Sequence, residues 1–354
     1  MESMIDGLLR SMHLRSGSDL HLVAGDPPRM RVNGDLITVQ NQRLDPEELR
    51  SELAALMSQA SLEQFERHDA ADFAHTIPEV ARFRVNVFRH LNGVGAVFRS
   101  IPAKALTLEQ LNMPQSVHEL SRANRGMILV TGKTGSGKST TLAAIIDAIN
   151  GRMKGHIVTI EDPIEFVHQR QQCLISQREV GVHSPSFSAA LHSALREDPD
   201  AILVGELRDL ETMSIAMTAA EMGILVMGTL HTNGASATID RVVNIFPADK
   251  QDHVRNMLST SLRGVVSQQL LKRKDGSGRV AALEILINTS ATANLIRQGK
   301  LEQLENVMQS SAAAGMCTMD TSLKRLLDER VVSGQEAYLQ SFDKTKFEQY
   351  KDIA

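Results

Sequence analysis

The chain has 354 residues, 42% of them hydrophobic and 23% charged, a composition typical of a globular protein large enough for two domains. Its formal charge is −4 and it contains no long basic run, which argues against a large non-specific nucleic-acid surface. Its two cysteines, Cys173 and Cys317, form no CxxC pair, so the sequence predicts neither a disulfide framework nor a zinc site.

The first part of the chain alternates helical and strand-like patterns. It has no basic segment followed by an apolar stretch and no apolar run long enough to cross a bilayer, so we expect no signal peptide and a cytoplasmic protein. Residues 1–101 are predicted to form an α+β domain. Its predicted elements are a helix over 5–12, a strand over 18–22, a hairpin with arms 29–32 and 36–39 around Asn33-Gly34, one helix over 44–67, and strands over 83–87 and 94–101.

Residues 102–115, within which Pro102 and Pro114 stand, are predicted to be a linker or hinge. From 116 to 289, apolar strands alternate with helices, the pattern of a parallel sheet with helices on both faces and hence of an α/β fold. We predict strands at 127–130, 157–160, 202–204 and 224–230, helices at 140–149 and 186–196, and a charged turn at 272–279. Asn150-Gly151 is predicted to end the first of these helices, and residues 290–354 are predicted to be a helical region.

Residues 132–139 have the sequence G-K-T-G-S-G-K-S, a complete phosphate-binding loop of the form G-x-x-x-x-G-K-S. An apolar strand precedes the loop and a helix follows it, and this context argues against a glycine-rich turn that matches by chance. Lys138 is expected to reach the β- and γ-phosphates of ATP, and Ser139 to bind Mg²⁺ through its hydroxyl. The predicted nucleotide-binding residues are Gly132, Lys133, Thr134, Gly135, Ser136, Gly137, Lys138, Ser139 and Thr140.

Carboxylates follow two of the predicted strands. Glu206 follows the apolar segment 201–204 and is predicted to act as a general base. Gly205 stands before it, where an Asp is usual. The strand 157–160 leads into Glu161, Asp162 and Glu165, where open α/β sheets place their ligands. We expect these three to arrange metal and water, with Glu161 joining Ser139 at the metal. The alternative for Glu206 is a surface Glu at a strand end, and the alternative for these three is an acidic turn that caps a helix.

Three further residues are candidates for contact with the phosphates. His231 follows the strand 224–230 and could sense the γ-phosphate through a neutral imidazole, although a lone His is usually structural. Arg84 and Arg99 stand on predicted strands of the first domain, and phosphoryl transfer benefits from an arginine directed at the γ-phosphate. Most arginines on strands are merely solvated, so their spacing alone gives this role little weight.

The order of these segments resembles the type IV pilus retraction ATPases, the PilT/PilU group of the secretion-ATPase superfamily. The resemblance covers nearly the whole chain and includes the phosphate loop, the family's Asp box at 159–166, an atypical Walker B motif at 205–209 and a His box at 229–232 with 240–241. Segments 18–22, 81–86, 176–181 and 194–200 also match. One departure lies at Ala291–Gln298, where the family has a stretch like A-I-R-N-L-I-R-E and this chain differs at Thr292, Ala293 and Gln298.

The resemblance implies a homohexameric ring in which a PAS-like N-terminal domain is followed by a RecA-like ATPase domain, with nucleotide between them. It implies that Arg84 and Arg99 match arginines that reach the nucleotide, and that the motor drives pilus retraction through an inner-membrane platform protein and alongside a paralogous pilus ATPase. The protein would then be peripheral to the inner membrane through the pilus machinery. The alternatives are a pilus assembly or type II secretion ATPase, a monomeric P-loop kinase of small molecules, and a nucleic-acid translocase, which the negative charge disfavours.

Overall fold

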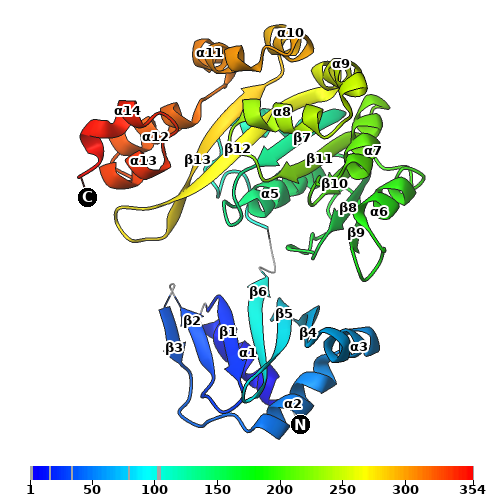
Figure 1. The fold of residues 1–354 in the computed structure, drawn as a ribbon, viewed down its shortest axis with the longest axis vertical. Helices are drawn as coiled ribbons and strands as arrows, with labels where there is room; N and C mark the ends of the chain where they lie inside the picture. The colour runs from blue at the N-terminus through cyan, green and yellow to red at the C-terminus, as the bar shows by residue number, and fades with distance from the viewer. Residues whose placement is uncertain (1–2, 16, 33–34, 79, 102–104, 354) are drawn as a thin grey trace. The chain divides into compact units, whose positions relative to one another are not determined.

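The structure is a computed structural model that describes residues 3–15, 17–32, 35–78, 80–101 and 105–353. The chain divides into two compact units, one of Met1–Lys104 with Glu165–Val167 and one of Ala105–Ile164 with His168–Ala354 (Figure 1). Among the described residues, no helix combines the length and the apolar composition that crossing a bilayer requires. Each unit has its own sheet and its own hydrophobic core.

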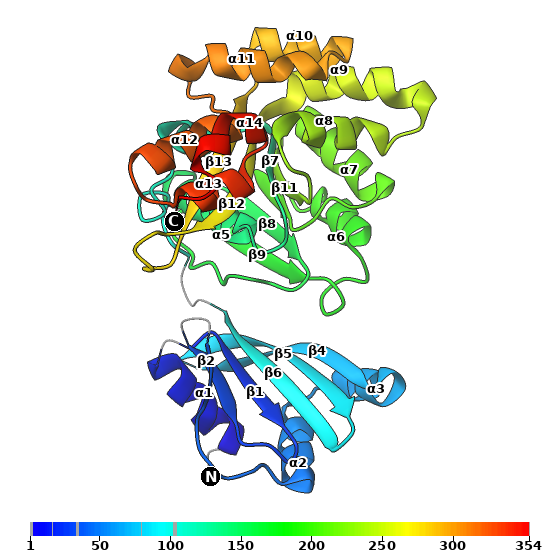
Figure 2. The ribbon, with the colours of Figure 1, turned by 60° about the vertical axis from the view of Figure 1, so that its left-hand side comes forward.

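The first unit is built on a six-stranded antiparallel sheet in the order β3-β2-β1-β6-β5-β4 (Figure 1), and Figure 2 labels its strands from β2 to β4. Alternate residues of β5, such as Phe83 and Val85, are buried against side chains of α1 and α2, which leaves Arg84 between them exposed. The elements are α1 (Met4–Leu14), β1 (Asp19–Val23), β2 (Arg29–Val32), β3 (Asp35–Thr38), α2 (Pro46–Leu56), α3 (Gln59–His68), β4 (Ala70–Ile77), β5 (Ala81–His90) and β6 (Gly93–Ile101).

Two predictions for the first unit need correction. The single helix expected over 44–67 is two helices, because Ser58 accepts a hydrogen bond from the Ser61 backbone N–H at 3.2 Å and so caps α3 at its N-terminus. Strand β4 was not predicted, because its polar residues mask the alternating pattern of a strand at the edge of the sheet. The predicted turn at Asn33-Gly34 lies outside the described residues.

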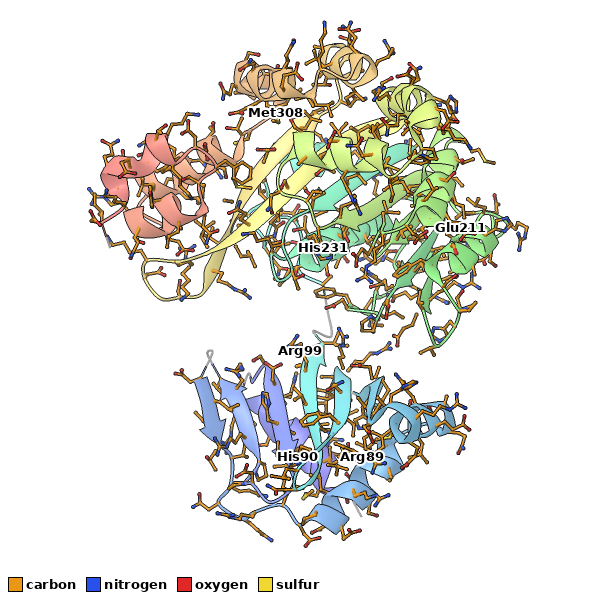
Figure 3. All side chains as sticks on the ribbon, viewed as in Figure 1. Arg89, His90, Arg99, Glu211, His231 and Met308 are labelled. Carbon is orange, nitrogen blue, oxygen red and sulfur yellow. The ribbon has the colours of Figure 1, made fainter. Side chains whose placement is uncertain are left out.

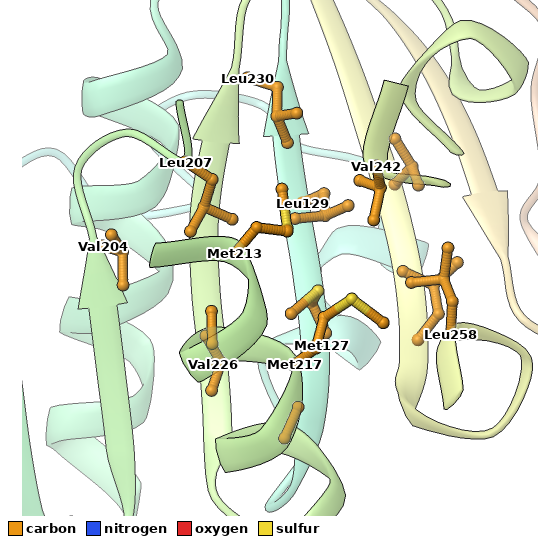
Figure 4. Close-up of a cluster of buried hydrophobic side chains, with 14 of the residues drawn as sticks. Met127, Leu129, Val204, Leu207, Met213, Met217, Val226, Leu230, Val242 and Leu258 are labelled. Atoms are coloured by element: carbon orange, nitrogen blue, oxygen red, sulfur yellow. The ribbon is translucent and has the colours of Figure 1, made fainter. Parts of the chain in front are cut away.

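The second unit contains a seven-stranded sheet in the order β13-β12-β7-β11-β10-β8-β9, in which only the β12–β13 pairing is antiparallel. Met127 and Leu129 of β7 pack against α7 on one face (Figure 4), while Ile128 and Val130 pack against α5 on the other. The mixed α/β fold predicted from the sequence is therefore present. The strands are β7 (Gly126–Thr131), β8 (His156–Glu161), β9 (Leu174–Glu179), β10 (Ala201–Val204), β11 (Leu225–Leu230), β12 (Leu262–Lys272) and β13 (Arg279–Ile287).

Helices cover both faces of this sheet and continue past it to the C-terminus. The helices among the strands are α4 (Gln115–Leu120), α5 (Lys138–Arg152), α6 (Phe187–Ala194), α7 (Leu210–Glu221), α8 (Ala235–Asn244) and α9 (Gln251–Ser261). The helices after β13 are α10 (Ser290–Gln298), α11 (Leu304–Ser310), α12 (Met319–Asp328), α13 (Gly334–Gln340) and α14 (Lys344–Phe347). Four single 3₁₀ turns, η1 (Ala248–Lys250), η2 (Leu301–Gln303), η3 (Ala312–Ala314) and η4 (Glu348–Tyr350), complete the described elements. Apolar residues of α12 pack on the ends of β12 and β13, which ties the C-terminal helices to the sheet.

The predicted end of the helix after the phosphate loop is wrong, because α5 continues through Asn150-Gly151 to Arg152. The side chain of Asn150 is buried and satisfied by a later segment of the chain: it donates to the Gln169 carbonyl at 2.7 Å and accepts from the backbone N–H groups of Gln171 and Cys173 at 3.1 and 3.2 Å. Tertiary hydrogen bonds thus outweigh the helix-ending tendency of the Asn-Gly pair.

The predicted linker at 102–115 is only partly described. Residues 102–104 lie outside the described residues, and Leu108 and Met113 are buried in the core of the second unit. The role of this segment as a hinge stays a prediction.

The structure makes His168 a source of acid sensitivity, because burial lowers the pKa of its imidazole from 6.5 to about 4. The folded state therefore resists protonation of His168, so its contribution to stability is complete above pH 6.5 and is lost as the pH falls toward 4. We expect His168→Gln to reduce the loss of unfolding free energy between pH 7 and pH 5 by about 2 kcal/mol. Denaturant titrations at the two pH values measure this; His253→Gln on the exposed side of α9 is the control, and an equal effect of both changes would contradict the assignment.

Candidate functional site

Four predicted segments meet at one edge of the second sheet. The phosphate loop follows β7, His231 follows β11, Glu206 follows β10, and Glu161 ends β8. These strands are consecutive in the sheet and run parallel, so their carboxyl ends lie side by side. Figure 3 labels His231 at this edge. The arrangement explains how residues up to about a hundred positions apart in the chain come to share one site.

The backbone of the phosphate loop favours glycine at three positions. Gly132 has φ +140°, Gly135 has φ +79° and Gly137 has φ +88°, and Gly137 caps α5. A Cβ at Gly132 would lie 2.3 Å from the carbonyl oxygen of Gln268, and one at Gly137 would lie 2.6 Å from its Nε2. Gln268 of β12 therefore lies against the loop, and it also accepts a hydrogen bond from the hydroxyl of Thr141 at 2.7 Å.

The loop has the features that a phosphate requires. Lys133, Thr134, Gly135 and Ser139 are exposed and Thr140 is half-buried, while the Ser136 hydroxyl is buried without a hydrogen-bond partner in the described part of the chain. A buried orphan hydroxyl is costly unless a ligand completes it. Together with the N-terminus of α5, these groups fit the triphosphate of a nucleotide.

Lys138 is a desolvated cation at the centre of this loop. Its residue surface is 8% exposed, and its Nζ donates to the carbonyl oxygens of Gly132 at 2.9 Å and Lys133 at 3.1 Å. Burial lowers the pKa of Lys138, and the charge of Glu206 opposes that shift. A cation removed from water in this way interacts strongly with an anion brought beside it.

His231 lies between Lys138 and Glu206. Its Nδ1 is 3.5 Å from the Nζ of Lys138, and its Nε2 is 3.3 Å from Oε1 of Glu206. Because an ammonium group can only donate, we assign Nδ1 as the acceptor, which places the ring hydrogen on Nε2, facing the carboxylate. The imidazole thereby connects the ammonium group of Lys138 to the carboxylate of Glu206.

Glu206 has a second partner that the sequence did not suggest. Arg208 donates from Nε to the same Oε1 at 2.7 Å, and this bond with Glu206, together with the charges of Glu206 and Asp162, raises the pKa of the Arg208 guanidinium. The Glu206 side chain is 20% exposed, so water can reach it. The sequence signal for Arg208 was its place in the Walker B segment 205–209, and the signal for Gln268 was the polar pair Gln268-Gln269 within an apolar segment.

The three acidic residues of the Asp-box segment lie in different environments. Glu161 is 7% exposed and accepts hydrogen bonds from the hydroxyl of Thr159 at 2.7 Å and from Nε2 of Gln177 at 3.3 Å. Asp162 is exposed and lies close enough to Arg208 to affect its pKa. Glu165 belongs to the short segment grouped with the first unit, and its role stays a prediction. In the described part of the chain, no three His, Cys, Asp or Glu side chains converge as ready-made metal ligands.

Arg84 and Arg99 lie in the first unit, directly opposite each other on β5 and β6. Arg99 donates from Nε to Asp19 at 2.9 Å, while the Nε of Arg84 is 3.9 Å from Asp72. The side chain of Arg99 is 68% exposed, and that of Arg84 is 45% exposed. Like charges opposite each other in a sheet are unfavourable, and the carboxylates of Asp19 and Asp72 offset part of this repulsion.

The stretch at 291–298, which departs from the family pattern, forms most of α10. Thr292 is fully buried and makes a capping box with Thr289: its hydroxyl accepts from the Thr289 N–H at 2.7 Å, and its own N–H donates to the Thr289 hydroxyl at 3.4 Å. The departure at Thr292 therefore has a local structural reason, because Thr can complete this cap and Ile cannot.

Comparison with known proteins places the chain in a defined group. Residues 1–338 match the family described as type II/IV secretion system protein. The chain is 50% identical over 333 residues to the type IV pilus retraction ATPase PilT of Pseudomonas aeruginosa, covering 94% of this chain and 96% of that protein. It is 49% identical over 330 residues to a twitching motility protein of Neisseria gonorrhoeae, covering 93% and 88% of the two chains. A crystal structure of the pilus retraction motor PilT with bound ADP superposes with a TM-score of 0.91 at 42% identity, covering 99% of this chain and all of that one.

Proposed function

The chain belongs to the type II/IV secretion system protein family and is an ATPase, and from this premise we propose that it drives type IV pilus retraction through a ring of identical subunits. The observation that carries the catalytic part of this proposal is the continuous contact from Lys138 through His231 to Glu206 at the edge of the sheet. A phosphate-binding cation, a linking imidazole and a carboxylate are the parts that hydrolysis of a nucleoside triphosphate needs.

We assign the following roles. The backbone of 132–137, Lys138 and Thr140 bind the phosphates, and Glu206 takes the proton of the attacking water. Ser139 and Glu161 are the residues that would hold Mg²⁺, whose charge would stabilise the phosphates during transfer. His231 contacts both Lys138 and Glu206. A shift of Lys138 toward the phosphates would therefore also change the orientation of the Glu206 carboxylate. Asp162 and Glu165, with Glu161, arrange metal and water.

The mechanical part of the proposal concerns the assembly. Six copies would form the ring, the segment at 102–115 would be the hinge between a PAS-like and a RecA-like domain, and rotation would act on an inner-membrane platform protein. The ring would work in the cytoplasm, peripheral to the membrane, alongside a paralogous pilus ATPase. This proposal is supported by two relatives named for pilus retraction and twitching motility, which are 50% and 49% identical to this chain over 94% and 93% of its length.

We expect Arg84→Ala and Arg99→Ala to lower the turnover of ATP by about 10³-fold while nucleotide affinity stays within a few-fold. The reason is that these guanidinium groups would stabilise charge that develops on the phosphates during transfer. Steady-state hydrolysis and nucleotide titration on the purified full chain measure the two quantities. Arg89→Ala is the matched control, because Arg89 lies on β5 with Arg84 and forms salt bridges with Glu66 and Asp69. Equal losses in all three variants would mean that the arginines only stabilise the first unit.

A count of pili on cells that lack this protein tests the function itself. Surplus pili are expected for a retraction motor, and an absence of pili would instead indicate an assembly ATPase. Mass by light scattering, measured with specific activity across protein concentration, tests the ring. A fully active monomer would refute the ring and favour the kinase alternative.

A further inference from the structure

Glu284 is a buried carboxylate outside the site described above. It lies on β13, is 5% exposed, and has both oxygens engaged by backbone N–H groups. Oε1 accepts from Ala235 at 2.6 Å, and Oε2 accepts from Met319 at 3.1 Å. Ala235 is the first residue of α8 and Met319 is the first residue of α12, so one carboxylate binds the N-termini of two helices.

The helix α8 begins four residues after His231, and the intervening loop is held at adjacent points. Glu284 and Ser267 are directly opposite each other on β13 and β12. Ser267 accepts from the N–H of Gly234 at 2.9 Å, next to the Ala235 N–H that Glu284 accepts. This pair of facing side chains thus fixes where the loop from His231 enters α8.

The other oxygen of Glu284 reaches the C-terminal helices. Met319 starts α12, whose N-terminus is also capped by Thr318 through the backbone N–H of Thr321 at 3.3 Å. A cavity of about 500 Å³ borders Gly234, Glu284 and Met319, so the carboxylate joins the two helix ends beside space that side chains do not fill. The Glu284 carboxylate therefore contacts both the start of α12 and the start of α8.

We propose that Glu284 is a positioning residue for ATP hydrolysis, which holds the His231 loop in its working place and couples that loop to the C-terminal helix α12. The inference rests on the proposed roles of His231 and Glu206. It adds a route by which the C-terminal helices and the nucleotide site influence each other.

The first test is Glu284→Gln, which keeps the size of the side chain but leaves one oxygen to serve two N–H donors. We expect kcat to fall by about 10- to 100-fold, the usual cost of a small misplacement of reacting groups, with KM for ATP within about 3-fold. Hydrogen exchange should become faster at the amides that begin α8 and α12. Melting temperatures, with kinetics measured well below them, separate this effect from general unfolding.

Two further variants resolve the two ends of the contact. Ser267→Ala removes only the acceptor for Gly234, so kcat should fall while exchange in α12 stays at the parent rate. Thr318→Ala weakens the N-terminal cap of α12 and leaves Glu284 unchanged. It should lower kcat in the parent background but not in the Glu284→Gln background, so the two effects should be non-additive. Glu305→Gln, a carboxylate on the same cavity whose partner is the exposed Gln309, is the control and should behave as the parent.

These measurements distinguish a failure of the proposed Glu284 coupling from a failure of the proposed function. Parent kcat in Glu284→Gln, or additive effects of Thr318→Ala and Glu284→Gln, would overturn the coupling. If Glu284→Gln does not fold, a Thr318→Ala variant with parent kcat would overturn it on its own. A parent chain that does not hydrolyse ATP would instead refute the proposed function and leave the contacts of Glu284 as a purely structural feature.

Discussion

Replacing Lys138 with Ala is expected to abolish ATP hydrolysis while the melting temperature stays close to that of the parent. The ammonium group is desolvated and bonds only loop carbonyls and His231 among the described residues, so its removal takes away the main positive charge at the phosphates and little packing. Phosphate release by the purified variant measures the loss. Lys133→Ala, an exposed lysine of the same loop, is the matched control and should retain most activity.

Two outcomes would contradict this prediction. Hydrolysis at the parent rate by Lys138→Ala would mean that the nucleotide site is wrongly assigned. An equal loss in Lys133→Ala would mean that the loop is sensitive to any change and that Lys138 has no special role.

Glu206→Gln is expected to bind nucleotide normally and to lower turnover by about 10²–10⁴-fold, the usual contribution of a general base. Gln keeps an oxygen that can accept the hydrogen bonds from His231 and Arg208, so the local geometry should persist while the proton acceptor is lost. Nucleotide titration and single-turnover hydrolysis measure the two effects separately. Glu211→Gln, an exposed carboxylate in the first turn of α7, is the control (Figure 3).

The pattern of losses also identifies the role of Glu206. If nucleotide binding is lost while the rate per bound ATP stays normal, Glu206 is a metal ligand and not the base. If Arg208→Ala alone reproduces the full defect, the ion pair with Arg208, and not proton transfer, is the essential feature.

Much of the site could be predicted from the sequence because its parts follow short apolar strands. The strands that end before Gly132, before Glu206 and before His231 are buried on both faces, so their apolar runs are unbroken and their ends are marked by polar or glycine residues. The carboxyl ends of such strands meet in a parallel sheet, which made the meeting of these residues predictable.

The hairpin of β12 and β13 could not be predicted in this way, although the turn between its strands was. Ser267, Gln268 and Gln269 interrupt the apolar pattern of β12. Ser267 bonds the loop that enters α8, and Gln268 bonds Thr141 of α5, instead of filling a core. Glu284 interrupts β13 for the same reason. A polar residue inside a buried strand is satisfied by groups distant in sequence, and a single sequence does not say which ones.

The facing arginines Arg84 and Arg99 on β5 and β6 lower the stability of the sheet that carries them. Two guanidinium groups opposite each other lower the stability of the sheet by about 0.2–1 kcal/mol relative to a neutral pair, even where Asp19 and Asp72 offset part of the repulsion. Selection for heat resistance alone would therefore replace Arg84 or Arg99 with a β-branched or aromatic residue, whereas the role proposed for them would keep both. On the role proposed for Arg84 and Arg99, an engineered thermostable version that replaces either of them would lose activity.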